Sequence, residues 1–136
     1  MDTLTPRQRS KQMALVRSKD TAPELTVRRI VHRLGYRYRL HVASLPGCPD
    51  LVFPSRQKVI FVHGCFWHQH RCRRGRRMPG THVDYWRTKL TRNKQRDAAH
   101  RRKLRRNGWR VLTLWECQLK PSQREALLDR LVAFLE

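Results

Sequence analysis

DLVFPSRQKVIFVH, residues 50–63, is the stretch that decides the fold. Two short runs within it, residues 50–53 and 58–63, are rich in β-branched and aromatic residues, and Pro54-Ser-Arg-Gln separates them. Short runs of this composition on either side of a turn predict a β-hairpin. A sheet built around this hairpin is therefore the expected centre of the fold.

The segments on both sides of the hairpin predict helices and further strands. Upstream, an apolar face predicts a helix over residues 23–34, which Gly35 ends, and alternating aromatic and basic residues predict a strand over 36–41. Downstream, the patterns predict a long basic helix at 83–107, a strand at 109–115 and an amphipathic helix at 122–135. This order indicates an α/β fold, with a small mixed β-sheet flanked by helices in three layers.

The charge of the chain is its most unusual property. Its 136 residues suit one domain, and 31 Lys and Arg against 10 acidic residues give a formal net charge of +21. Solubility alone accounts for a net charge of magnitude up to about 8, so a partner with the opposite charge is expected. Nucleic acid is the favoured partner, because basic residues occur in every segment. A membrane is disfavoured, since no apolar run approaches the roughly 20 residues that span a bilayer.

The first 20 residues predict a basic arm. Residues 5–16 have few large apolar side chains and a helix-starting Thr5-Pro6 pair, which suits a helix lying on a partner. We therefore expect one domain over residues 1–136, with residues 1–20 contacting DNA. The N-terminus has no apolar signal region, so we expect a cytoplasmic, nucleoid-associated protein in a reducing compartment.

Cysteine and histidine spacing predicts a structural zinc site that staples a loop to the core. Cys65, His70 and Cys72 lie close together, and Cys117 follows the last expected strand. Three cysteines and one histidine make a closed tetrahedral zinc site. Spacing leaves the ligating histidine open, since the other histidines nearby are His63, His68 and His82. The alternative is that Cys65 and Cys117 are buried thiols; Cys48 lies outside the cluster and is expected to be free.

Asp50 is the candidate catalytic carboxylate. It begins one hairpin strand, which places it near Val62 and His63 at the end of the other. A magnesium ion takes one or two carboxylates together with phosphate and water. The alternatives are that Asp50 caps a turn, and that Glu24 only complements the dipole of its helix.

Two polar residues lie on the apolar seam of the long helix. Asn93 and Asp97 lie on the side that Val83, Trp86 and Leu90 define. Asp97 either forms an ion pair with Arg101 four residues later or points into a functional site. We favour the structural role for both residues.

Three strings of residues resemble the very-short-patch repair (Vsr) endonucleases. They are SLPGCPD at 44–50, FVHGCFWH at 61–68 and WRVLTLWEC at 109–117, and the similarity runs from about Arg9 to the C-terminus. The resemblance implies a fold similar to type II restriction endonucleases, with a variant of their PD-(D/E)XK metal motif. It also implies a bacterial enzyme that nicks one strand of duplex DNA, 5′ to the thymine of a T·G mismatch left by deamination of 5-methylcytosine.

The resemblance further implies roles for individual residues. Asp50 would hold magnesium together with the backbone carbonyl of Val62. His68 would be the base that activates water, with His63 and Glu24 in supporting roles. The implied zinc ligands are Cys65, His70, Cys72 and Cys117.

This sequence departs from the family pattern at a few positions. Val62 stands where threonine is frequent, and Cys48 stands where a basic residue is usual. Gln69 and Arg71 replace histidines. Residues 73–80 are more basic and richer in glycine than usual.

Aromatic residues near the cysteines are candidate wedges for a mismatch. A wobble pair stacks poorly, so an apolar side chain opens that step at a lower cost than a matched one. Phe66, Trp67 and Trp86 are the candidates, and the resemblance agrees; core packing is the alternative, above all for Trp86. We expect a monomer, with mismatch-repair proteins as possible further partners. The rival functions are a zinc-stabilised DNA-binding module without catalysis and a nuclease that cuts both strands.

Overall fold

The structure is a computed structural model that describes residues 21–136. The expected helix at 5–16 and the basic arm at 1–20 lie outside the described residues. The elements are, in chain order, α2 (Ala22–Arg33), β1 (Arg39–Leu40), β2 (Leu51–Phe53), the 3-10 turn η1 (Pro54–Arg56), β3 (Lys58–His63), α3 (Val83–Arg106), β4 (Arg110–Trp115), the 3-10 turns η2 (Glu116–Leu119) and η3 (Pro121–Gln123), and α4 (Arg124–Leu135).

A four-stranded mixed sheet lies at the centre, in the order β1-β2-β3-β4. β1 and β2 are antiparallel, β2 and β3 form the expected antiparallel hairpin, and β3 and β4 are parallel. Gln57 makes the hairpin turn in the left-handed region, with φ of 53°. The predicted mixed sheet with flanking helices is therefore confirmed.

The strand expected over residues 36–41 is much shorter in the structure. Only Arg39–Leu40 pair with β2. His41 adopts a left-handed backbone, with φ of 47°, and this conformation ends the strand. The prediction was wrong in length because the alternating pattern carries no signal for this turn.

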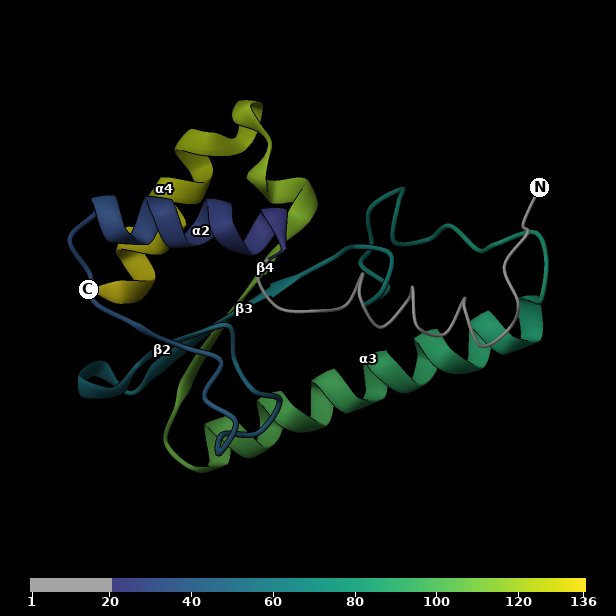
Figure 1. Cartoon of the computed structure of the whole chain (residues 1–136), viewed down its shortest axis with the longest axis horizontal. Coiled ribbons are helices and arrows are strands. Elements are labelled where there is room, and N and C mark those ends of the chain that lie inside the picture. The colour runs from purple at the N-terminus through teal and green to yellow at the C-terminus, as the bar shows by residue number, and fades with distance from the viewer. Residues whose placement is uncertain (1–20) are drawn as a thin grey trace.

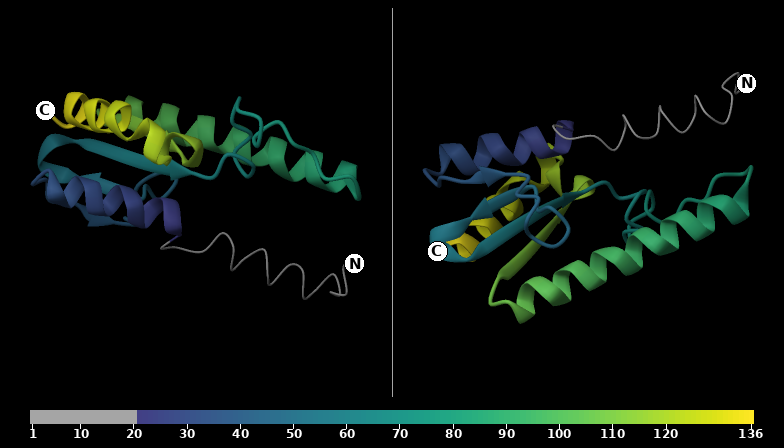
Figure 2. Two further views of the ribbon diagram at one scale, coloured as in Figure 1. Left: turned by 90° about the horizontal axis from the view of Figure 1, so that it is seen from above. Right: turned by 60° about the horizontal axis from the view of Figure 1, so that its bottom comes forward.

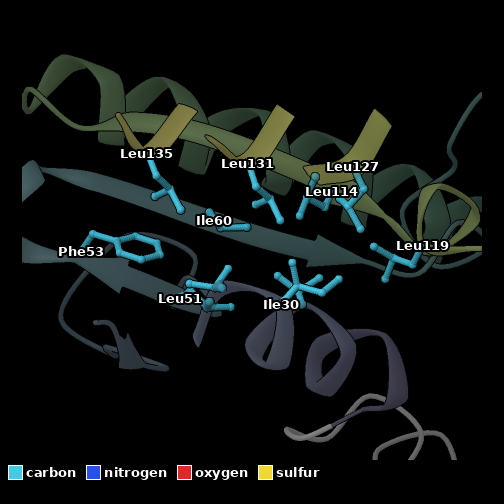
Figure 3. Packing of buried hydrophobic residues seen from close by; sticks show 11 residues of the cluster. Ile30, Leu51, Phe53, Ile60, Leu114, Leu119, Leu127, Leu131 and Leu135 are labelled. Carbon is cyan, nitrogen blue, oxygen red and sulfur yellow. The ribbon is translucent and has the colours of Figure 1, made fainter. Parts of the chain in front are cut away.

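One face of the sheet packs against α2 and α4 (Figure 1). Alternate residues of the strands, Leu51 and Ile60 among them, meet Ile30 of α2 and Leu131 of α4, as Figure 3 shows. Leu131 is completely buried, and truncation of such a leucine to alanine costs about 2–5 kcal/mol of folding free energy. This layer fixes the position of α2, and with it Glu24.

The opposite face packs against α3. The intervening strand residues, Val52, Val59 and Phe61, form a second cluster with Leu104 of α3. Gly108, with φ of 88°, ends α3 and leads into β4. The two clusters make the expected three layers, with α3 below the strands in Figure 1 and α2 and α4 above them.

α3 is longer than the sheet that it covers. Its first half runs past the strands, and the segment between β3 and α3 lies beside it (Figure 2). Residues 64–82 therefore lie beside α3 in a region to which the sheet does not extend. Within residues 21–136, no helix combines the length and the apolar character that crossing a bilayer requires.

Candidate active site and metal centres

A cavity of about 450 Å³ opens where β2 begins and β3 ends. The antiparallel pairing of β2 with β3 puts Asp50 beside Val62, and the parallel pairing of β3 with β4 puts Trp115 beside His63. Side chains from α2, the sheet, the following loop and α3 all line this cavity. Its charged and histidine residues are Glu24, Asp50, His63, His68, Arg96, Asp97, His100, Arg101 and Glu116.

Asp50 lies against a second buried carboxyl group. The backbone N–H of Val62 donates a hydrogen bond to Asp50 Oδ2 at 2.6 Å. Burial raises the pKa of Asp50 to about 8, and the side chain of Glu24 raises it further. Glu24 is itself only 4% exposed and is paired with Arg28. Two carboxyl groups held together out of water favour a bound proton or a bound cation between them.

His41 completes this group, although the sequence analysis did not select it. His41 Nε2 lies 2.9 Å from Glu24 Oε2 and 3.9 Å from Asp50 Oδ1. Its backbone N–H also reaches the carbonyl of Asp50, at 3.5 Å. The pairing of β1 with β2 explains its place: the two strands are antiparallel with Leu40 opposite Leu51, so the next residue, His41, lies opposite Asp50. Glu24, His41 and Asp50 offer one ligand atom each within 4.8 Å of one another.

Across the cavity, two histidines are stacked. The ring centroids of His63 and His68 lie 3.8 Å apart, with the ring planes at 7°. Burial lowers the pKa of His63 to about 3, and the neighbouring His68 lowers it further. His63 Nδ1 is buried and has no hydrogen-bond partner among the described residues. His63 is therefore a neutral wall of the cavity at physiological pH.

Asp97 holds His68 by one ring nitrogen. Its Oδ2 lies 2.5 Å from His68 Nδ1. Burial acts to raise the pKa of Asp97, but the hydrogen bond and charge of His68 outweigh it and the pKa falls. The ion pair considered for Asp97 with Arg101 does not form within 4 Å; Asp97 lies in the site instead.

Cysteine and histidine side chains converge beside the cavity. Cys65, His70, Cys72 and Cys117 each offer one ligand atom, and these atoms lie within 4.8 Å of one another. His70 Nδ1 is 3.5 Å from Cys117 Sγ and 3.8 Å from Cys65 Sγ. Three sulfurs and one nitrogen suit a tetrahedral zinc ion. Of the histidines considered, His63 and His68 lie with Asp97 in the cavity and not with the cysteines. Cys48 is outside the cysteine cluster and lines the cavity.

The loop that carries these ligands is tightly folded. Gln69 Nε2 donates to the carbonyls of Phe66 and Gly75, at 3.2 and 2.8 Å. A side chain at Gly75 would place its Cβ 2.0 Å from the carbonyl oxygen of His70, so glycine is required there. Among the cysteines, burial raises the pKa of Cys65 to about 12. Although burial acts in the same direction on Cys72, hydrogen bonds from the Gly75 backbone and His70 lower the pKa of Cys72 to about 6.

Three aromatic residues form a cluster outside both core clusters. Ring centroids are 5.2 Å apart for Phe66 and Trp67, 5.7 Å for Phe66 and Trp86, and 5.8 Å for Trp67 and Trp86. All three are half-buried, and none belongs to the hydrophobic clusters of the sheet. Buried Asn93 donates to the carbonyl of Trp67 at 3.2 Å, so the second polar residue of the α3 seam positions this loop.

A family model described as DNA mismatch endonuclease Vsr matches residues 1–74. The type II nicking enzyme V.XorIIP of Xanthomonas oryzae is 51% identical over 118 residues, which cover 87% of this chain and 86% of that protein. The chain belongs to the Vsr family. DNA mismatch endonuclease Vsr of Escherichia coli is 40% identical over 90% of this chain and 80% of its own length. The type II nicking enzyme V.NmeAIP of Neisseria meningitidis is 39% identical over 88% and 84%.

Membership of the Vsr family decides between the rival functions at a coarse level. The family consists of DNA mismatch endonucleases, so this Vsr protein is a nuclease that acts on DNA. A DNA-binding module without catalysis is set aside. The ionisable cavity at the end of β3 is the candidate site for that chemistry.

Proposed function

We propose that this Vsr protein nicks one strand of duplex DNA, 5′ to the thymine of a T·G mismatch, in a magnesium-dependent reaction. The observation that carries the proposal is the cavity itself: a carboxyl pair, half-buried Asp50 with buried Glu24, faces a histidine held by Asp97. One wall suits a cation and the other suits a base. The reaction of a nuclease needs both next to one phosphate.

The residues on the first wall fit a magnesium ion. Asp50 and Glu24 are hard oxygen donors, and their shared burial disfavours leaving both ionised without a cation. In this proposal Asp50 and the backbone carbonyl of Val62 would hold the ion, with Glu24 and His41 beside them in supporting roles. When bound, magnesium stabilises the negative charge that develops on the phosphate and on the leaving 3′ oxygen.

His68 is the proposed base. Its Nδ1 is engaged by Asp97, so Nε2 is the nitrogen that takes the proton of the attacking water. The oxygen of that water forms the new bond to phosphorus, the bond from phosphorus to the 3′ oxygen breaks, and solvent supplies a proton to the leaving oxygen. The charge of Asp97 stabilises the imidazolium that forms, and neutral His63 beside it adds no opposing charge.

Basic side chains on α3 are the proposed ligands of the scissile phosphate. Arg96, His100 and Arg101 line the cavity from successive turns of the helix. Arg101 is half-buried and forms no ion pair within 4 Å among the described residues, while its charge acts on both His63 and Asp97. A guanidinium with this setting is suited to bind two oxygens of a phosphate.

Mismatch selection is assigned to the aromatic cluster. Phe66, Trp67 and Trp86 lie outside the core, and Trp67 also lines the cavity. In this proposal, insertion of these rings beside a weakly stacked T·G pair would bring the adjacent phosphate to the cavity that Trp67 and Asp50 both line. We further propose a monomer that uses all 136 residues, with the first 20 as an arm on the DNA, mismatch-repair proteins as further partners, and a fold related to the PD-(D/E)XK nucleases.

The zinc ion is proposed to be structural. Cys65, His70, Cys72 and Cys117 would fill all four positions of a tetrahedral zinc ion, which leaves no open position for water or substrate. The ion would order residues 64–82, which carry His68 and Trp67 but little apolar material of their own.

Incubation of the purified protein with magnesium and a duplex containing one T·G mismatch tests the proposal. One nick 5′ to the mismatched thymine is expected, with none in the matched duplex or in EDTA. Cutting of both strands, or equal nicking of matched DNA, would contradict it.

A further inference from the structure

A second hollow, lined mostly by cations, shares Glu116 with the proposed catalytic cavity. Its volume is about 610 Å³, and its cationic side chains are Arg73, Arg74, Arg77 and Lys120. Cys72, Cys117 and Glu116 complete its lining. We call these four cationic residues and the space between them the basic hollow.

Four positive groups face one space that contains a single carboxylate. Glu116 Oε1 is 3.2 Å from Arg74 Nη1 and accepts the backbone N–H of Cys65, also at 3.2 Å. Glu116 therefore neutralises Arg74 and ties it to the zinc cluster. Arg73, Arg77 and Lys120 form no ion pair among residues 21–136, so no carboxylate neutralises these three positive side chains of the hollow.

The backbone beneath these cations is held in place. The N–H of Arg76 bonds the carbonyl of Cys72 at 3.1 Å, and Arg76 Nε bonds the carbonyl of Arg71 at 2.5 Å. Gly75 is pressed against His70, as described above. Lys120 comes from a different part of the chain, directly after η2. Like charges from two segments are thus held together by the fold, and their mutual repulsion favours an anionic ligand.

The position of the hollow indicates which anion it takes. Glu116 lines the basic hollow and the catalytic cavity alike, so the two spaces share a wall. A strand of DNA with its scissile phosphate in the cavity has further phosphates along the same backbone, and duplex DNA presents one charge per roughly 1.7 Å of its axis.

We propose that the basic hollow binds backbone phosphates of the DNA beside the nicked position. This inference rests on the proposed function for the placement of the scissile phosphate. The hollow adds affinity that is independent of base sequence and extends the footprint beyond the mismatch, because contacts to phosphate set position rather than specificity. The zinc cluster orders the loop that carries three of the four cations.

The salt dependence of binding tests the proposal. Arg73→Gln, Arg77→Gln and Lys120→Gln are combined, while Arg74 is kept because it pairs with Glu116. Binding of a matched and of a T·G duplex is measured between about 50 and 200 mM salt without magnesium. The slope of log K against log salt, taken as an absolute value throughout, is expected to fall by about 2–3 for both duplexes, since each phosphate contact contributes about 0.9.

The control removes the same charge elsewhere. Arg105, Arg106 and Arg110 are exposed at the end of α3 and the start of β4, at the other end of that strand from Glu116. Their combined replacement by glutamine is expected to lower the slope by less than 1. Equal slopes for the two triple variants, or an unchanged slope in the first, would overturn the proposal. If the hollow binds an acidic protein and not DNA, the slope of the first variant is expected to stay unchanged.

Zinc content and thermal unfolding of the variant check that it is folded. If the triple variant loses zinc, the single variants Arg73→Gln and Arg77→Gln replace it, each with an expected fall in slope of about 0.9. The proposed T·G specificity is judged separately, from wild-type nicking of mismatched against matched DNA. Loss of that preference with an intact slope effect would overturn the specificity and leave the hollow as a phosphate site.

Discussion

Asp97 Oδ2 lies 2.5 Å from His68 Nδ1, although the two residues come from a long helix and an irregular loop. The contact fixes which ring nitrogen of His68 is available and supplies a negative charge beside it. Asp97 is therefore a positioning residue for the proposed base.

Asp97→Asn is expected to lower kcat by about 10²- to 10⁴-fold, the range that a general base contributes. An amide at this position keeps the shape but no longer stabilises an imidazolium. Single-turnover nicking of the T·G duplex measures the change, and the dissociation constant for the same duplex should stay within about threefold. Asp84→Asn, at an exposed position on the same helix, is the control. A defect confined to binding would remove Asp97 from the chemistry.

Asp50→Ala is expected to abolish nicking while mismatch binding persists. The change removes a proposed magnesium ligand, but no contact that the aromatic cluster makes. Binding is followed by anisotropy of a labelled T·G duplex, and nicking by gel. His41→Ala, which keeps both carboxyl groups, should retain part of the activity. Full activity of Asp50→Ala at saturating magnesium would refute the proposed metal position.

The hairpin and the carboxylate at its edge were predictable, and the reasons are local. Residues 50–63 contain both strands and their turn. The alternation of side chains between the two faces of these short strands is enough to set the register that brings Asp50 to Val62. His41 did not follow from the hairpin, because its position opposite Asp50 depends on the pairing of β1 with β2, which no pattern in residues 50–63 sets. A left-handed residue ends that strand, and its pattern of side chains does not differ from that of a longer strand.

The contacts of the loop at 64–82 could not be derived in the same way. Helical spacing favours Arg101 as the partner of Asp97, since the two residues are four apart on one helix. The contact of His68 with Asp97 depends instead on the course of an irregular loop, which the spacing of side chains does not predict. Spacing also left four histidines as candidates beside the cysteines, and only the family resemblance selected His70. Lys120 had no signal at all, because its place beside Arg73 depends on how η2 turns after β4.

Cys117→Ser is expected to lower the zinc content of the purified protein well below one ion per chain. Cys117 is the proposed ligand that joins the loop to the end of β4, so its replacement would remove this link between residues 64–82 and the sheet. The melting temperature should fall by several degrees, because a domain of this size loses roughly 2–8 °C for each kcal/mol. Cys48→Ser is the matched control, since Cys48 lies outside the cluster. Equal zinc content in the two variants would exclude the proposed ligand set.

Trp67→Ala is expected to reduce the preference for T·G over matched DNA. Stacking of an aromatic side chain on a base contributes about 1–3 kcal/mol, so the ratio of the two dissociation constants should fall by about 5- to 150-fold. The melting temperature should change little, because Trp67 is half-buried outside the two core clusters. Tyr85→Ala, at an exposed aromatic residue near the cluster, serves as the comparison. An unchanged ratio together with a large loss of stability would assign Trp67 to packing.

Arg101→Gln and Arg102→Gln form the sharpest pair, because the two arginines are adjacent on α3 and differ only in what they face. Arg101 is half-buried in the catalytic cavity, whereas Arg102 is exposed and does not line it. Both changes remove one positive charge, so long-range attraction to DNA falls equally in both. Only Arg101→Gln should also lower kcat, by about 10²-fold or more, since a donor aimed at charge that develops in the transition state has an effect of this size. Single-turnover rates at saturating protein separate this loss from weaker binding. Equal rates in the two variants would mean that the charge of Arg101 acts through the general field of the protein and not on the scissile phosphate.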